Sequence, residues 1–218
     1  MMAFDPNGKA VAGKYLTPFM ERNMEDLKEK KQELRKKIDK KISDLSRKEL
    51  KQKYQAIEDQ LFEFANFLEA QTALLYISQP NEVDTRPILK RCGQELKQIV
   101  LPLFHPDNNG ARFYKLYNIE SDLKTGPGNI VGPDPDRCKL VNMDAIDIAI
   151  IPGIAFDEKG GRLGDGTGRY DRIIPKLPAT TRKVAFAIED QMVAQVPMDS
   201  HDKYVDIIIT DKRIIYKI

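Results

Sequence analysis

The sequence concentrates glycine and arginine in one short segment directly after a strongly apolar stretch. Residues 146–152 predict a buried strand, and five glycines follow within residues 160–168, before a helix expected from about Tyr170. Glycine lets the backbone approach a ligand closely, and the amide groups at a helix start point at anions. The same segment carries fixed positive charge that suits phosphate: Arg162, Arg169 and Arg172. This pattern predicts an anion-binding loop beyond the carboxyl end of a strand.

Two common nucleotide-binding motifs do not describe this loop. A Walker A sequence needs Gly-Lys-Ser or Gly-Lys-Thr, and no lysine directly follows these glycines. The dinucleotide fingerprint fails as well, because Arg169 stands where that motif needs a glycine. The residues alone leave a purely structural glycine-rich turn as the alternative.

A second group of positive charge lies on a predicted amphipathic helix near the N-terminus. Apolar residues recur there at helical spacing from Leu27 to Leu45. Lys31 falls on this apolar stripe and Arg35 follows one turn later, so both side chains can face one ligand. Lys31 therefore either reaches a phosphate or is a snorkelling lysine whose head returns to water.

The chain has 218 residues and a formal net charge of +2, but this charge is unevenly distributed. Residues 28–53 hold 12 basic and five acidic side chains, so this segment carries +7 and the remainder carries −5. A basic helical arm could bind nucleic acid, an acidic membrane surface or a small phosphate ligand, or simply form a solvated helix face. The arm has few aromatic residues and no RNA-binding motif, so we expect no nucleic-acid partner.

Composition argues against several other classes of protein. No apolar run approaches the roughly 20 residues of a membrane helix, and residues 1–23 lack the apolar stretch of a secretory signal. The two cysteines, Cys92 and Cys138, cannot make a disulfide framework or a zinc site of their own. We therefore expect a cytoplasmic protein with no membrane partner, and a monomer by default.

The order of the predicted elements indicates an α/β fold. A capping box from Ser46 to Glu49 starts a second helix, and short apolar strands then alternate with helices, as around a mostly parallel sheet. We expect a three-layer sandwich in one domain, residues 24–218, with an N-terminal helical arm and with residues 1–23 as a tail. Strands are predicted at residues 74–77, 98–103, 112–117, 146–152, 183–188, 205–210 and 213–218, and a loop at 121–137.

Four motifs in a fixed order resemble those of the 5-formyltetrahydrofolate cyclo-ligases, also called methenyltetrahydrofolate synthetases. The main motif is PGIAFD at residues 152–157 followed by GRLGxGxGxYDR at residues 161–172. The others are KxxLR at residues 31–35, Ser78 with EVDT at residues 82–85, and VP at residues 196–197 with HDxxVD at residues 201–206. The resemblance covers about residues 28–210, and its ordered motifs are more specific together than any one alone.

The resemblance implies an activity, the ATP-dependent conversion of a folate substrate, 5-formyltetrahydrofolate, to 5,10-methenyltetrahydrofolate with Mg²⁺. It implies ATP contacts at Lys31, Arg35, Arg162, Leu163, Gly164, Asp165, Gly166, Thr167, Gly168, Arg169 and Tyr170. It also implies folate contacts at Gln79 and Asp84, and magnesium ligands at Asp171 and Asp202. Alternatively, Asp171 is a carboxylate at the N-terminus of a helix, where the helix dipole stabilises it without a metal. Glu82, in the same motif as Asp84, could serve only to order its loop.

Three loop residues depart from the family pattern. The family commonly has an aromatic or basic residue at Asp165, Gly or Lys at Thr167, and an aromatic residue at Arg169. Asp165 brings a negative charge toward the expected phosphates, which is unfavourable unless magnesium or Arg169 offsets it. The departures leave a second hypothesis open, a non-catalytic homologue that binds folate or nucleotide on the same fold.

Overall fold

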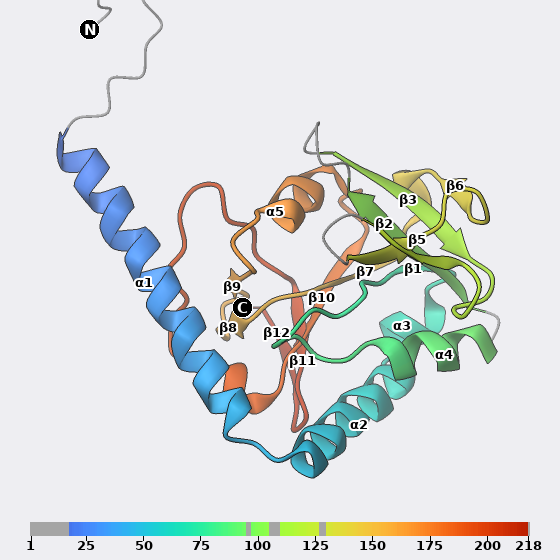
Figure 1. The fold of residues 1–218 in the computed structure, drawn as a ribbon, viewed down its shortest axis with the longest axis horizontal. Coiled ribbons are helices and arrows are strands. Elements are labelled where there is room, and N and C mark those ends of the chain that lie inside the picture. The colour runs from blue at the N-terminus through green and yellow to red at the C-terminus, as the bar shows by residue number, and fades with distance from the viewer. Residues whose placement is uncertain (1–17, 95–96, 105–109, 127–129, 218) are drawn as a thin grey trace, which may run out of the picture.

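The computed structural model describes residues 18–94, 97–104, 110–126 and 130–217, with side chains from residue 22 onward. Eight strands form one sheet in the order β12-β11-β10-β7-β1-β2-β3-β6 (Figure 1). Strands β11, β10, β7, β1 and β2 are parallel to one another, whereas β12, β3 and β6 are antiparallel to their neighbours. The strands are β1 (Thr72–Leu74), β2 (Gln98–Phe104), β3 (Ala111–Leu116), β6 (Lys139–Val141), β7 (Ile148–Ile151), β10 (Arg182–Phe186), β11 (Ile207–Ile209) and β12 (Ile214–Tyr216).

Helices cover both faces of this sheet, so its central strands are buried on both sides. In β7, Ile148 and Ile150 pack into the cluster formed with the N-terminal helices, while Ala149 and Ile151 pack with Ile173 on the opposite face. In Figure 1 the helices α2, α3 and α4 lie on one side of the sheet and α5 on the other. The helices are α1 (Pro18–Ser43), α2 (Arg47–Glu63), α3 (Ala65–Glu69), α4 (Arg86–Gln94) and α5 (Arg169–Ile173), with 3₁₀ turns η2 (Met143–Ala145), η3 (Ile174–Lys176) and η4 (Glu189–Gln191). The predicted three-layer α/β fold is confirmed.

The two N-terminal helices are fixed by local sequence signals. The Ser46 hydroxyl accepts from the Glu49 amide at 3.2 Å, and the Glu49 carboxylate accepts from the Ser46 amide at 2.8 Å, which completes the predicted capping box. Helix α1 begins at Pro18 rather than at Met24, so the helical arm is longer than its apolar pattern indicates. Residues 1–17 of the predicted tail lie outside the described part of the chain.

Two segments predicted as loops contain short hairpins. The segment 121–137 holds β4 (Leu123–Thr125) paired with β5 (Val131–Pro133), and the glycine-rich segment holds β8 (Ala155–Phe156) paired with β9 (Arg162–Leu163). Strands of two or three residues are too short to give an alternating apolar pattern, so the sequence does not reveal them. Both hairpins lie beside the pocket described below.

Among the described residues, no helix is both long enough and apolar enough to cross a membrane.

Candidate active site

The glycine-rich loop connects the buried strand β7 to helix α5. Gly166 and Gly168 have φ angles of +96° and +64°, a left-handed conformation that side chains rarely adopt, and Gly168 is the N-cap of α5. A Cβ on Gly166 would lie 3.4 Å from the Arg35 guanidinium. These two glycines therefore let the loop turn tightly against helix α1.

Arg162 is the most buried cation of the loop, with 3% of its surface exposed. Its Nη1 donates to the Pro152 carbonyl at 3.0 Å and its Nη2 donates to Asp171 Oδ1 at 2.6 Å. The Nε is buried without a hydrogen-bond partner among the described residues. Burying a guanidinium with an unmatched donor is costly, which is typical of a group kept for a ligand.

Helix α1 reaches the loop through Arg35. Its Nε donates to the Gly164 carbonyl at 2.9 Å. Burial lowers the pKa of Arg35, and the negative charges of Asp165 and Asp202 oppose that shift. Arg35 thus places a second positive charge at the loop, from a segment more than a hundred residues away in the sequence.

Lys31 lies one turn earlier on α1, between two carboxylates. Its Nζ lies 2.7 Å from Asp199 Oδ2 and also pairs with Asp202 Oδ2, and we call these three residues the Lys31 cluster. Burial disfavours the charged lysine, but the hydrogen bonds to the two carboxylates outweigh it and raise its pKa. The ATP and magnesium residues of the resemblance, Lys31 and Asp202, are therefore in direct contact.

Two hydrogen bonds to Asp171 link the chain next to the Lys31 cluster to the buried arginine. The Lys203 amide, next to Asp202 in the chain, donates to Asp171 Oδ1 at 3.0 Å, and the same oxygen accepts from Arg162. Segments near residues 31, 162 and 202 are thus assembled at one place.

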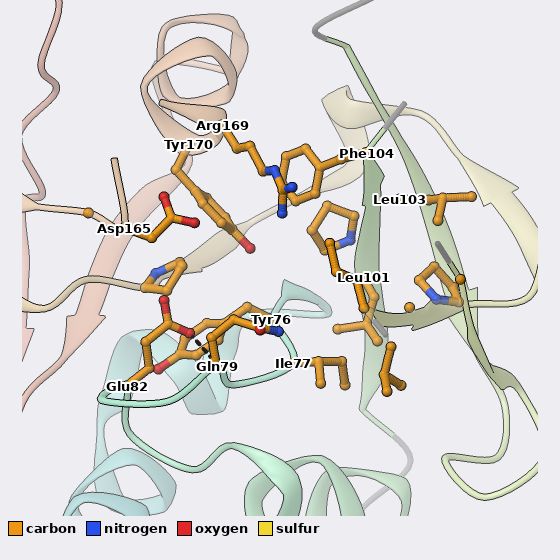
Figure 2. Close-up of a pocket in the computed structure, with 18 of the residues that line it drawn as sticks. Tyr76, Ile77, Gln79, Glu82, Leu101, Leu103, Phe104, Asp165, Arg169 and Tyr170 are labelled. Carbon is orange, nitrogen blue, oxygen red and sulfur yellow. Dashed lines mark hydrogen bonds between the residues drawn. The ribbon is translucent and has the colours of Figure 1, made fainter. Parts of the chain in front are cut away.

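A pocket of about 420 Å³ opens beside this assembly (Figure 2). One wall is aromatic: the Phe104 and Tyr170 rings meet edge to face with centroids 5.5 Å apart. The Arg169 guanidinium lies 5.4 Å from the centroid of Phe104, over its face. Figure 2 shows Arg169 pointing into the pocket from the same side as Phe104. The family commonly has an aromatic residue at position 169. Here Phe104 of β2 supplies an aromatic wall, and Arg169 adds a positive charge beside it.

The opposite wall carries negative charge. Glu82 Oε2 accepts from the backbone amide of Gln79 at 2.8 Å, and Asp165 lies above it, beside Tyr170 (Figure 2). Burial raises the pKa of Glu82 to about 7; the charge of Asp165 adds to the shift, and the Gln79 amide and Arg162 oppose it. A carboxyl with this pKa can carry or release a proton near neutral pH.

The predicted site residues fall into three groups. Eight of them line the pocket: Gln79, Arg162, Gly164, Asp165, Gly168, Arg169, Tyr170 and Asp171. Five do not line it: Arg35, Gly166 and Thr167 adjoin residues that do, whereas Lys31 and Asp202 pair with each other and are linked to the lining residue Asp171 through the Lys203 amide. The last two have structural contacts. Leu163 is buried in the core, and Asp84 accepts from the Arg86 amide at 3.1 Å at the start of α4 and pairs with the Arg86 side chain.

Several lining residues escape the sequence reasoning. Residues 101–104 of β2 and the β4–β5 hairpin form much of the apolar lining. Glu82 also lines the pocket, and only the folded structure shows this position. The usable signal is topological: ligands of open α/β sheets bind beyond the carboxyl ends of the strands, and β1, β2 and β7 end here.

The two predicted magnesium ligands fit a cation that arrives with phosphate. The described residues hold no cluster of three or more His, Cys, Asp or Glu side chains suited to a metal. Mg²⁺ usually takes only one or two carboxylates and completes its shell with water and phosphate oxygens. The bonds to Asp171 from Arg162 and Lys203 both end on Oδ1, so Asp171 can offer Oδ2.

The fold and the site define an α/β enzyme with a glycine-rich loop beside a pocket. The model of the 5-formyltetrahydrofolate cyclo-ligase family matches residues 27–211. The Escherichia coli 5-formyltetrahydrofolate cyclo-ligase is 30% identical over 146 residues, 66% of this chain and 80% of that protein. The Haemophilus influenzae 5-formyltetrahydrofolate cyclo-ligase is 26% identical over 175 residues, 80% of this chain and 94% of its own. This chain belongs to the 5-formyltetrahydrofolate cyclo-ligase family.

Solved structures agree with the assignment. The Aquifex aeolicus 5,10-methenyltetrahydrofolate synthetase superposes with a TM-score of 0.74 at 30% identity, covering 85% of this chain and 92% of that one. The Mycoplasma pneumoniae 5,10-methenyltetrahydrofolate synthetase, at 24% identity and a TM-score of 0.66, has the same fold. The family predicted from the four sequence motifs is confirmed.

Proposed function

We propose that this protein converts 5-formyltetrahydrofolate to 5,10-methenyltetrahydrofolate, with ATP hydrolysed to ADP and phosphate. One observation carries the proposal: basic side chains from two segments far apart in the sequence, Arg35 of α1 and Arg162, meet at the glycine-rich loop beside a pocket of about 420 Å³. Lys31 lies one turn before Arg35 on α1 and pairs with Asp202.

The chemistry explains why ATP is needed. The formyl oxygen of an amide is a poor leaving group, so closing the ring by losing it requires activation. Transfer of the γ-phosphoryl group to that oxygen gives an imidate-like phosphate and releases ADP. N10 then attacks the formyl carbon and loses its proton to solvent, and the C–O bond breaks as phosphate leaves. Such a reaction depends mainly on positioning and on neutralising the phosphate charge.

The loop and helix α1 are suited to that task. Arg162 lines the pocket, and each of its terminal nitrogens carries a second N–H, so it can donate to a phosphate without losing the bonds to Pro152 and Asp171. Arg35 keeps its terminal nitrogens near Gly166 while its Nε holds Gly164. Asp171 and Asp202 would hold Mg²⁺, which when bound draws charge from the phosphate oxygens.

The pocket is suited to the folate. A reduced pterin ring carries N–H donors, and the carboxyl of Glu82 is placed to accept from them. Phe104 and Tyr170 offer an aromatic wall, and the Arg169 guanidinium suits a carboxylate of the substrate. Gln79 lies at the same wall as Glu82.

An absorbance assay tests the proposal, because methenyltetrahydrofolate absorbs in the near ultraviolet where the formyl substrate does not. We expect an ATP-dependent rise in absorbance with catalytic amounts of protein. No rise, even with protein equal to substrate, would contradict the proposal.

The same experiment separates the second candidate, a homologue that binds without turnover. Asp165 favours that candidate, because it places a carboxylate in the loop that faces the phosphates. The loop also folds around it: Asp165 Oδ1 accepts from the Thr167 amide at 2.9 Å and from its hydroxyl at 2.6 Å. Nucleotide or folate binding without product would select this candidate.

A further inference from the structure

Asp199 is a residue of the Lys31 cluster that the family motifs do not include. Its Oδ2 lies 2.7 Å from Lys31 Nζ, and the lysine side chain is only 13% exposed. Asp202 contacts the same ammonium group with its own Oδ2. Lys31 therefore faces two carboxylates where one would neutralise it.

The loop around Asp199 is built to hold both carboxylates on the lysine. Asp199 Oδ1 accepts from the His201 amide at 2.7 Å and from the Asp202 amide at 3.3 Å. In return, Asp202 Oδ2 accepts from the Asp199 amide at 2.8 Å. Each aspartate thus fixes the other, and an ammonium group with three N–H donors has two of them directed at carboxylates. One donor remains for a ligand.

The charge around this lysine is negative before any ligand binds. Lys31 contributes one positive charge, and Asp199 and Asp202 contribute two negative ones. The Lys31 cluster therefore carries a net charge of −1, beside a loop that carries the positive charges of Arg162, Arg169 and Arg172. The negative charge of the cluster disfavours a bare polyphosphate next to it and favours one that arrives with a divalent cation.

We propose that Asp199 is a positioning residue of the nucleotide site. It holds the Lys31 ammonium against Asp202, and it keeps the Lys31 cluster negative, so that ATP binds together with a divalent cation rather than as the free anion. The inference rests on the proposed function, because it requires that ATP binds at the glycine-rich loop.

The competing explanation is that Asp199 only ties the loop at residues 199–203 to helix α1. The molecule contains a matched case for that explanation, which we call the Lys53 cluster. Lys53 Nζ lies 2.8 Å from Asp190 Oδ2 and 3.1 Å from Asp211 Oδ2. It has the same composition, a helical lysine between two aspartates, so Asp190→Asn is a control that removes one carboxylate in the same way.

The experiment measures ATP binding by isothermal titration calorimetry without folate, so that no turnover occurs. Each protein is titrated with excess magnesium chloride and, separately, with EDTA. The proteins are the wild type, D199N, D199S and D190N. Asn and Ser keep an oxygen that can accept from the amides of residues 201 and 202 but remove the charge, and two variants guard against one that fails to fold.

We expect the wild type to bind ATP more tightly with magnesium than with EDTA. The measured ratio is the dissociation constant with EDTA divided by that with magnesium. In D199N and D199S this ratio should fall by at least about fivefold, chiefly because metal-free ATP binds more tightly to these variants. D190N should keep the wild-type ratio. A mere tether predicts instead a lower melting temperature in all three variants with the ratio unchanged, and that result would overturn the inference.

The outcomes also separate this inference from the proposed function. If the wild type binds magnesium ATP and forms product, while both Asp199 variants keep its ratio, only the inference is overturned. If the wild type binds no ATP and forms no product, the proposed function fails and the inference fails with it.

Discussion

Two lysines on successive helices make the same kind of contact, and their surroundings give them different roles. The Lys31 cluster and the Lys53 cluster each place an ammonium group between two aspartates from the C-terminal half of the chain. In both, burial opposes the charged lysine and hydrogen bonds to the carboxylates raise its pKa. Neither the ion pairs nor the pKa directions distinguish a site from a tether.

The further bonds of the two clusters do distinguish them. The loop of the Lys31 cluster continues through Lys203 to Asp171 and so to Arg162 in the pocket. The Lys53 cluster continues to the backbone of η4, where the Glu189 amide donates to Asp211 Oδ1 at 2.6 Å. An ion pair is informative about function through what it adjoins, because the lysine pKa shifts in the same direction in both places.

Cutting the link between the Lys31 cluster and the pocket should have the largest effect. Replacing Arg162 with Ala removes a buried donor to the phosphate and leaves Asp171 without its cation. We expect kcat/KM to fall by about 10²–10³, as when a preorganised donor to developing charge is lost. Steady-state kinetics measure this. R162K keeps the charge without the fork that spans Pro152 and Asp171, so it should recover only part of the loss.

Removing the lysine of the same cluster should have the next largest effect. Lys31→Ala removes a charge near the phosphates and leaves two carboxylates facing each other. We expect kcat/KM for ATP to fall by about 10–10², with most of the change in KM. Wild-type kinetics with ATP in K31A would mean that the Lys31 cluster is only a tether.

The matched substitution in the other cluster should act on stability alone. Lys53→Ala leaves Asp211, 7% exposed, without its cation, and we expect the free energy of unfolding to drop by about 1–3 kcal/mol. The kinetic constants should stay at wild-type values. Denaturant unfolding and the absorbance assay measure the two quantities, and a selective loss of ATP affinity would remove the distinction between the clusters.

The smallest effect concerns Glu82, a half-buried carboxyl whose charged neighbour is Asp165 instead of a lysine. Its pKa is raised from 4.5 to about 7 in the fold, so the unfolded chain loses the proton first as the pH rises. The free energy of unfolding therefore falls between pH 4.5 and 7, by about 1–2 kcal/mol, and is constant above that window. E82Q should lack this contribution. Thermal unfolding of both proteins across pH 4–8 tests it, and parallel curves would contradict the raised pKa.

Local patterns in the sequence predict much of the fold. The capping box at Ser46 and the apolar strand at residues 146–152 depend on neighbouring residues, so both could be predicted from the sequence. The tight turn before α5 could be predicted for the same reason, since its glycines lie close together in the chain, whereas anion binding by this loop stays a prediction.

The rest of the site depends on tertiary structure. Lys31 and Asp199 are 168 residues apart, and no pattern along the chain indicates that they meet. The raised pKa of Glu82 arises from burial, which a sequence motif does not encode. Asp84, chosen from the same motif, instead accepts from the amide of Arg86 at the start of α4.

The most direct test of the account is the stoichiometry of the reaction. The purified protein is mixed with 5-formyltetrahydrofolate, ATP and magnesium, and both methenyltetrahydrofolate and ADP are quantified. The account predicts one ADP for each methenyltetrahydrofolate formed, and no product when ATP is omitted. Product formed without ATP, or no product with it, would contradict the account.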